Sequence, residues 1–166
     1  MIVIGLCSPE PGCGKDTFAR INNMHRFAFA DKIREAAVKL GWDGLKDEKG
    51  RTFLIDIGSA TRKYNPDFFA EDTINDIKRA SLDVIGVTDL RFYNEWEKLY
   101  QAFPNNFITV GIERKTDSGF RDDPTQIEYK RIPKDFIIHN DGDYESFEIK
   151  CREVYDAIRA NYVKLL

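Results

Sequence analysis

Hydrophobic residues along the chain form short runs that alternate with segments of helical spacing. This alternation is typical of a parallel α/β sheet, in which each strand is followed by a helix. The runs predict five strands, at Ile2 to Cys7, Arg26 to Ala30, Asp83 to Val87, Phe107 to Ile112 and Phe136 to His139. We therefore expect an α/β fold of three layers, with helices on both faces of a five-stranded parallel sheet.

Three helices are predicted from the spacing of their apolar residues. The first runs from Lys32 to Leu40 and stops at Gly41. The second is expected to begin at Asn65 as its cap, with Pro66 at the first helical position. The third starts near Tyr144, where apolar residues recur every three or four positions. The buried stripe of the second helix would consist of Phe69, Thr73, Ile74 and Ile77.

Length and composition narrow the class of protein. A chain of 166 residues with 42% hydrophobic content predicts one domain over residues 1–166 with a sizeable core. A net charge of -3 argues against binding to polymeric nucleic acid, which requires a basic surface. No apolar run is long enough for a signal peptide or a membrane span, so we expect a cytoplasmic protein without a membrane partner. Its three scattered cysteines are expected to be reduced.

The strongest chemical signal is the segment PEPGCGKDT, residues 9–17, which follows the first predicted strand. Gly12 and Gly14 allow the backbone to curl so that its amides face phosphate oxygens. Lys15 then supplies an ammonium group to the β- and γ-phosphates of a nucleotide. The alternative is a glycine-rich turn between strand and helix with an accidental lysine.

This segment departs from the common phosphate-loop pattern, because Pro9 replaces its first glycine and Asp16 its Ser or Thr. It nevertheless resembles the PGxGKGT loop of adenylate kinase-like enzymes. Thr17 stands at the position of the threonine in that loop. Cys13 is expected to be a small loop residue rather than a nucleophile. The residues expected to bind ATP here are Pro11, Gly12, Cys13, Gly14, Lys15, Asp16 and Thr17.

Further segments resemble the deoxynucleoside monophosphate kinase family of bacteriophages, a branch of the P-loop nucleoside monophosphate kinases. The resemblance covers nearly the whole chain and implies an acceptor-side helical insertion at about residues 42–80 and a lid at about 114–133. The chain departs from the family in Pro9, in a first helix about one turn shorter, and in its lid. The matching segments are GKDTFA, FAFADKIREA, RTFLIDIGSATR, NPDFF, DLRFYNE and DFIIHNDG.

Four residues are candidates for binding the acceptor. The resemblance places Asp31 at the acceptor, although it could equally act only as a helix cap. Arg34 could reach phosphate or stay solvated. Arg51 and Arg62 are eleven residues apart, close to three helical turns, so they share one face and could clamp an anion. A solvated basic face is the alternative, and Arg62 matches the acceptor-phosphate arginine of the family.

The segment VIGVTDLRFYNE is expected to be a buried strand that ends in an acidic residue. Asp89 there could hold magnesium through water, as could Asp16, or orient Lys15, and Arg91 could face the reacting phosphates. Asn94 and Glu95 are expected to cap and brace the next helix. Near the C-terminus, Asn140 either hydrogen-bonds the adenine of ATP or belongs to an ordinary turn.

The polar segment at 114–133 is either a functional lid or a mobile surface insertion. As a lid it would exclude water and bring in the charges of Arg114, Arg121 and Arg131. The expected partners are ATP with Mg²⁺ and a nucleoside or deoxynucleoside monophosphate, in a monomer or homodimer. Dephospho-coenzyme A kinase and a non-catalytic P-loop nucleotide-binding protein are the alternatives.

Overall fold

The computed structural model describes residues 1–115 and 124–163. The strands in this part of the chain are β1 (Ile2–Cys7), β2 (His25–Phe27), β3 (Val84–Leu90), β4 (Phe107–Glu113) and β5 (Phe136–His139). The helices there are α1 (Lys15–Ile21), α2 (Phe29–Lys39), α3 (Glu48–Tyr64), α4 (Phe68–Arg79), α5 (Tyr93–Ala102), α6 (Pro124–Arg131) and α7 (Tyr144–Val163). The predicted bounds of β1 and β5 and the start of α7 are confirmed.

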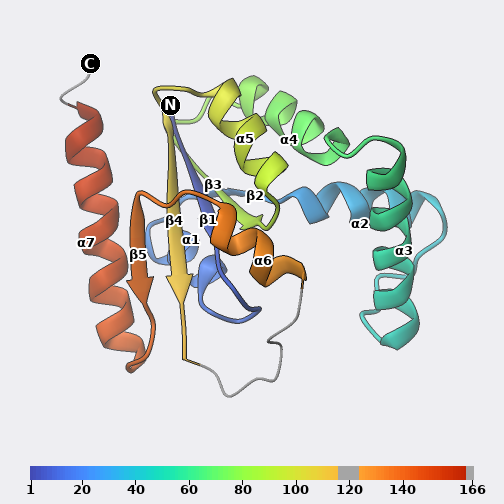
Figure 1. Cartoon of the computed structure of the whole chain (residues 1–166), viewed down its shortest axis with the longest axis horizontal. Coiled ribbons are helices and arrows are strands. Elements are labelled where there is room, and N and C mark those ends of the chain that lie inside the picture. Colours follow the sequence, from blue (N-terminus) through green and yellow to red (C-terminus); the bar gives the residue numbers. More distant parts are fainter. Residues whose placement is uncertain (116–123, 164–166) are drawn as a thin grey trace.

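The five strands form one parallel sheet in the order β2-β3-β1-β4-β5. Helices cover both faces, which confirms the predicted three-layer α/β fold (Figure 1). β1 lies at the centre, and all six of its residues are buried. A strand buried on both faces is apolar throughout, which explains why IVIGLC is a continuous hydrophobic run.

Alternate residues of β1 serve two separate halves of the core. Val3 and Cys7 face the cluster formed with α2, α4 and α5. Ile4 and Leu6 face the cluster formed with α1 and α7. The predicted stripe of α4 is confirmed, because Phe69, Thr73, Ile74 and Ile77 are all buried. All three cysteines are free and buried, in agreement with the prediction of reduced thiols.

Two predicted boundaries in the first half of the chain are wrong. The second strand ends at Phe27 rather than Ala30, because Phe29 and Ala30 already belong to α2. Asp31 consequently lies in the first turn of α2 and not at the end of a strand. The cause is a distant residue: Asp89 accepts hydrogen bonds from the amides of Phe29 and Ala30, at 2.9 Å each. These bonds satisfy amides that a helix N-terminus leaves without partners.

The predicted start of α4 is also wrong. Asn65 ends α3, and α4 begins at Phe68 after a short turn. In this turn the Asn65 Oδ1 atom accepts a hydrogen bond from the amide of Asp67 at 3.1 Å. The side chain of Asn65 therefore stabilises a turn between two helices. By accepting a hydrogen bond from a nearby backbone amide, it favours a turn over a helix at this point.

The helices α2, α3 and α4 project from one side of the sheet. Figure 1 shows α3 at the far end of α2, with α4 returning toward the sheet. α1 has only seven residues, which agrees with the shorter first helix noted in the sequence. α6 lies within the segment predicted as a lid and was not predicted as a helix. Arg121 of that segment lies outside the described residues.

Candidate functional site

The order of the strands brings two chain segments together at one edge of the sheet. β1 and β3 are neighbours, but the chain leaves β1 toward β2 and leaves β3 toward β4 on the opposite side. In open α/β sheets such a reversal opens a crevice at the carboxyl ends of the strands, where ligands bind. The phosphate loop (residues 9–17) follows β1, and Asp89 and Arg91 lie at the end of β3.

The phosphate loop has the backbone that its glycines predict. Gly12 and Gly14 have φ angles of +78° and +116°, values that side-chain-bearing residues rarely adopt. Space also requires glycine at position 14, because a Cβ atom there would lie 2.7 Å from Cζ of Phe147. Nothing lies within 4 Å of the corresponding position at Gly12. The loop is thus packed against α7 at Gly14 and open at Gly12.

Lys15 begins α1 and lies partly buried between cationic and polar neighbours. Its Nζ donates a hydrogen bond to Oγ of Ser8, which in turn donates to the carbonyl of Glu10 at 2.7 Å. Burial, followed by the charge of Arg91, lowers the pKa of Lys15 below its ordinary value. Two cations held close together in a partly desolvated place are an arrangement that an anion stabilises.

Asn140 braces the phosphate loop from behind. Its Nδ2 donates a hydrogen bond to the carbonyl of Cys13 at 2.8 Å, and both residues are buried. Nδ2 also lies 3.1 Å from where a Cβ of Gly14 would be. The structure thus gives the Asn140 amide a partner in the protein, and its contact with adenine stays a prediction. The burial of Cys13 fits the expectation of a small loop residue.

Asp16 and Asp31 are joined through Arg26 on β2. The guanidinium of Arg26 lies 3.1 Å from a carboxylate oxygen of Asp16 and 2.8 Å from one of Asp31. Asp31 also pairs with Arg34, one turn further along α2. Asp16 and Arg26 are exposed, Asp31 and Arg34 are half-buried, and neither Asp31 nor Arg34 lines the cavity described below. Their predicted contact with the acceptor stays untested.

The carboxylate of Asp89 is held by the N-terminus of α2, through the amides of Phe29 and Ala30. Burial raises the pKa of Asp89, and these amides, with Arg91, act in the opposite direction. Each oxygen keeps a second lone pair that could accept from a metal-bound water. Among the described residues no group of three or more His, Cys, Asp and Glu could hold a metal ion. Magnesium would therefore need the phosphates of a nucleotide as further ligands, which is its usual mode of binding.

A cavity of about 770 Å³ extends from Pro11 in the phosphate loop to the helices α2 and α3. One whole face of α3 forms a wall of this cavity, and the N-terminus of α2 and the turn between β3 and α5 form the rest. The lining residues are Pro11, Phe29, Ala30, Ile33, Arg51, Leu54, Ile55, Gly58, Ser59, Arg62, Asp89, Arg91, Phe92 and Glu95.

Arg51 and Arg62 both belong to α3 and both line this cavity, as their spacing in the sequence suggested. Eleven residues of α-helix rise about 16 Å along the axis, so the two arginines mark opposite ends of the wall. Between them the wall is partly apolar, through Leu54 and Ile55. A ligand that spans the wall would therefore meet a cation at each end and apolar surface in the middle.

Three side chains contact the guanidinium group of Arg62. Its guanidinium carbon lies 5.1 Å from the ring centre of Phe69 and 5.0 Å from that of Phe92. One of its terminal nitrogens lies 3.7 Å from Oε1 of Glu95. These contacts leave 31% of the Arg62 side chain exposed. Cation–π contacts and a nearby carboxylate stabilise the guanidinium in this position.

Glu95 is a buried acid, with 3% of its surface exposed. Its Oε2 accepts hydrogen bonds from the amides of Arg91 at 3.0 Å and Phe92 at 3.1 Å, which confirms the expected brace at the start of α5. Burial, and then the charge of Asp89, raises the pKa of Glu95 to about 7. Asn94 instead ties α5 to the turn before α4, donating to the carbonyl of Pro66 at 3.0 Å.

Arg114 and Arg131, the two arginines of the predicted lid that the structure describes, do not line the cavity. Arg114 is exposed just after β4. Arg131 on α6 pairs with Glu128 at 2.7 Å and lies 5.1 Å from the ring centre of Tyr93. Glu128 also accepts a hydrogen bond from the amide of Tyr93 at 2.9 Å. α6 is therefore docked on the start of α5, and the contribution of these arginines to catalysis stays a prediction.

The sequence did not reveal the two aromatic contacts of Arg62. Phe69 was expected in the core, where it lies, but its ring also contacts the guanidinium. Phe92 follows Arg91 directly in DLRFYNE, and Glu95 comes three residues later. The signal in the sequence was an aromatic residue and a Glu close to Arg91, a predicted phosphate-binding arginine.

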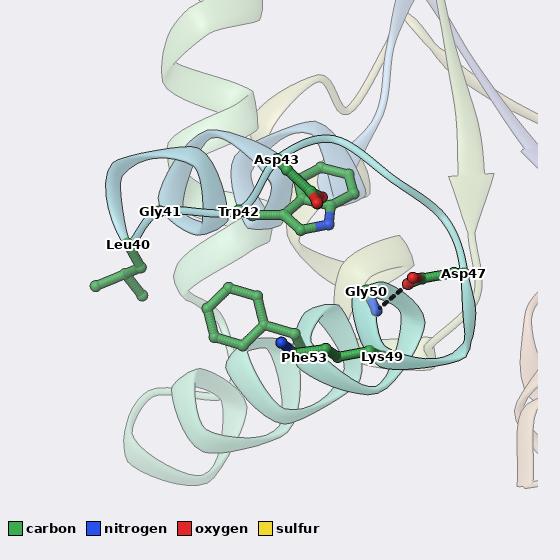
Figure 2. A pocket seen from close by; sticks show the side chains of 8 residues that line it. All are labelled: Leu40, Gly41, Trp42, Asp43, Asp47, Lys49, Gly50 and Phe53. Carbon is green, nitrogen blue, oxygen red and sulfur yellow. Dashed lines mark hydrogen bonds between the residues drawn. The ribbon is translucent and has the colours of Figure 1, made fainter.

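A second, smaller cavity of about 230 Å³ lies between the end of α2 and the start of α3. Figure 2 shows Trp42 and Phe53 facing this space, while Asp47 accepts a hydrogen bond from the amide of Gly50 at 2.7 Å. Asp47 is thereby the N-cap of α3. Lys49 is the single cationic residue in the lining, so this cavity lacks the cluster of cations that distinguishes the larger one.

No helix in the described ranges combines the length and the apolar character needed to cross a membrane. No protein family model matches the sequence, and no curated protein is significantly similar to it. Among solved structures, the chain is similar to the dephospho-CoA kinase from Campylobacter jejuni, with a TM-score of 0.51 and 20% sequence identity. The match covers 96% of this chain and 98% of that one. At this identity the likeness establishes the fold alone, which is a three-layer α/β fold around a five-stranded parallel sheet.

Proposed function

We propose that this protein is a kinase that transfers the γ-phosphate of ATP to a nucleoside or deoxynucleoside monophosphate. The observation that carries the proposal is the single cavity that reaches from Pro11 of the phosphate loop to Arg62 on α3. Donor and acceptor phosphates could meet inside it. The resemblance of GKDT and DLRFYNE to deoxynucleoside monophosphate kinases supports the choice of acceptor.

In the proposed reaction an oxygen of the acceptor's phosphate bonds to the γ-phosphorus while the bond from that phosphorus to the β–γ bridging oxygen breaks. Lys15 and the phosphate loop hold the donor, Arg62 binds the acceptor's phosphate, and Arg91 faces the transferred group. No general base is needed, because the attacking oxygen is already anionic near neutral pH. The residues therefore act by positioning the groups and by neutralising charge.

Magnesium fits this arrangement as a companion of ATP. Asp89 and Asp16 are the residues that would hold it, through water, and the ion would neutralise charge on the β- and γ-phosphates. Asp16 is largely exposed and would have to leave its ion pair with Arg26. Asp89 could keep its bonds to α2 and accept from water with its free lone pairs.

A second candidate function is phosphorylation of dephospho-coenzyme A. It is favoured by the solved structure that the chain resembles, which is a dephospho-CoA kinase. The fold comparison supports both acceptors equally. The third candidate, a non-catalytic nucleotide-binding protein, predicts ATP binding without turnover that depends on an acceptor.

A coupled assay of ADP release, run over a panel of acceptors, separates these functions. The panel contains the four common deoxynucleoside monophosphates, their ribose counterparts and dephospho-coenzyme A, each at the same concentration with Mg–ATP. We expect turnover with at least one deoxynucleoside monophosphate and background release with dephospho-coenzyme A. Turnover with dephospho-coenzyme A alone would overturn the proposed acceptor. ATP binding with no turnover on any acceptor would favour the non-catalytic protein.

A further inference from the structure

Glu95 lies where the turn after β3 meets α3, and its two carboxylate oxygens have different partners. Oε2 accepts from two backbone amides of the turn, at Arg91 and Phe92. Oε1 faces the guanidinium of Arg62 at 3.7 Å. One side chain therefore connects the turn that carries Arg91 and the helix that carries Arg62.

We infer that Glu95 is a positioning residue that holds Arg62 in the orientation in which it binds the acceptor. The inference rests on the proposed function, in which Arg62 contacts the acceptor's phosphate. Glu95 acts on Arg62 directly and through Phe92. The backbone amide of Phe92 donates to Glu95, and its ring contacts the guanidinium of Arg62.

The role of Glu95 as an acceptor for two backbone amides does not by itself require a charged side chain. Burying a carboxylate is unfavourable, and the oxygen of a neutral amide could accept the same two backbone hydrogen bonds. What the amide could not supply is a negative charge toward Arg62. The charge is useful here because it faces the guanidinium of Arg62 and favours the rotamer in which that group lies near Glu95.

The local shape of α3 also favours one position of Arg62. Gly58 lies one turn earlier, and a Cβ atom added there would be 3.0 Å from Nη1 of Arg62. It would also lie 3.1 Å from Cδ1 of Ile33 on α2. The missing side chain leaves room for the guanidinium to lie along its own helix, between Glu95 and the two phenylalanine rings.

Fixing Arg62 in advance lowers the entropic cost of binding. A free arginine loses rotamer entropy when it is immobilised. Here the rings of Phe69 and Phe92 and the carboxylate of Glu95 order the side chain during folding. The acceptor then meets an arginine that is already in place, which favours a productive geometry.

The test is a double-mutant cycle between Glu95→Gln and Arg62→Ala, measured as kcat/KM for the acceptor at saturating ATP. It is run at pH 8, above the Glu95 pKa of about 7, so that the wild-type carboxylate is charged. We expect E95Q to lower kcat/KM about tenfold in the wild type and less than about twofold in R62A, with KM for ATP unchanged. Glu97→Gln, at an exposed position of the same helix, is the matched control.

An equal loss from E95Q in both backgrounds would overturn the inference, since Glu95 would then act by general destabilisation. Unchanged or improved kcat/KM in E95Q would overturn it as well. If E95Q fails to fold, Glu95→Asp replaces it in the cycle, because this variant keeps the charge but withdraws it from Arg62. A similar, non-additive loss is then expected.

A second readout does not depend on turnover. In the wild type, ring currents of Phe69 and Phe92 should shift the NMR signals of the Arg62 side chain, and E95Q should move these signals toward ordinary arginine values. The loss of the shift in E95Q supports the positioning role even if no acceptor is phosphorylated. Turnover by the wild type together with unchanged Arg62 signals in E95Q leaves the proposed function intact and rejects the role of Glu95.

Discussion

The side-chain amide of Asn140 donates a hydrogen bond to the carbonyl of Cys13, although 127 positions separate the two residues in the chain. The bond ties the loop after β5 to the phosphate loop after β1. Both groups are buried, so the loss of one partner leaves the other without a hydrogen bond and without water.

We expect Asn140→Ala to reduce the free energy of unfolding by about 1–3 kcal/mol and to weaken ATP binding. Urea unfolding and calorimetric titration with ATP measure the two effects. Asn105→Ala, at an exposed position, serves as the control and should change neither. Unaltered stability of N140A would mean that the bond to Cys13 contributes nothing to the loop.

Gly14→Ala should destabilise the protein far more than Gly12→Ala. Both positions have positive φ angles, so both variants carry backbone strain of about 1–2 kcal/mol. At Gly14 the added methyl group also meets Phe147, whereas at Gly12 it meets open space. Thermal unfolding of the two variants checks the difference, and equal melting temperatures would contradict it.

Lys15→Ala should abolish phosphate transfer and leave the fold intact. Lys15 faces a partly buried polar site in which its charge is already disfavoured by burial and by Arg91. Its loss should therefore change the free energy of unfolding by no more than about 1 kcal/mol. Turnover and urea unfolding are compared with those of Lys46→Ala, an exposed control. Turnover of K15A at the wild-type rate would reject the phosphate-loop assignment.

Arg62→Ala should affect the acceptor and spare the donor. The loss of a charge-assisted contact corresponds to about 2–3 kcal/mol, or a decrease of about 100-fold in kcat/KM for the acceptor. Arg51→Ala, at the other end of α3, should act in the same direction with a smaller effect. Steady-state kinetics with each substrate varied in turn separates the two. A weaker affinity for ATP with normal acceptor kinetics would place Arg62 at the donor.

Glu95 should make stability depend on pH. Its pKa of about 7 in the folded protein lies above the ordinary value of 4.5, so between these values the folded state keeps a proton that the unfolded state releases. The stabilisation is therefore full below about pH 4.5 and is lost as the pH rises through about 7. The stability of wild type minus that of E95Q should fall by up to about 3 kcal/mol over this interval and then level off. Urea unfolding between pH 5 and 8 checks this, and a constant difference would contradict it.

Local patterns in the sequence predicted much of the fold and the position of the phosphate loop. The spacing of apolar residues indicated β1, β5 and α7, because the pattern of apolar positions within each element matches the face that it buries. The boundary between β2 and α2 was missed because Asp89, about sixty positions away, supplies the cap. Local sequence carries no sign of such a partner.

In the candidate site, too, the sequence predicted the residues of one local motif but not the contacts between distant segments. Lys15 and the glycines stand in one contiguous motif, whereas Arg62 acquires its surroundings from α4 and from the turn before α5. A sequence shows that an arginine is available for an anion. It does not show that Phe69, Phe92 and Glu95 will meet around it, since that meeting depends on how three helices pack.

The placement of α3 has a consequence for protein engineering. α3 supplies one wall of the large cavity, yet it sits at the far end of α2 and packs chiefly on that helix (Figure 1). The chain runs outward along α2 and back along α4, so α3 can be treated as an exchangeable cassette of 17 residues. Grafting this helix between related scaffolds would vary this wall of the cavity and leave the central strands and the phosphate loop untouched.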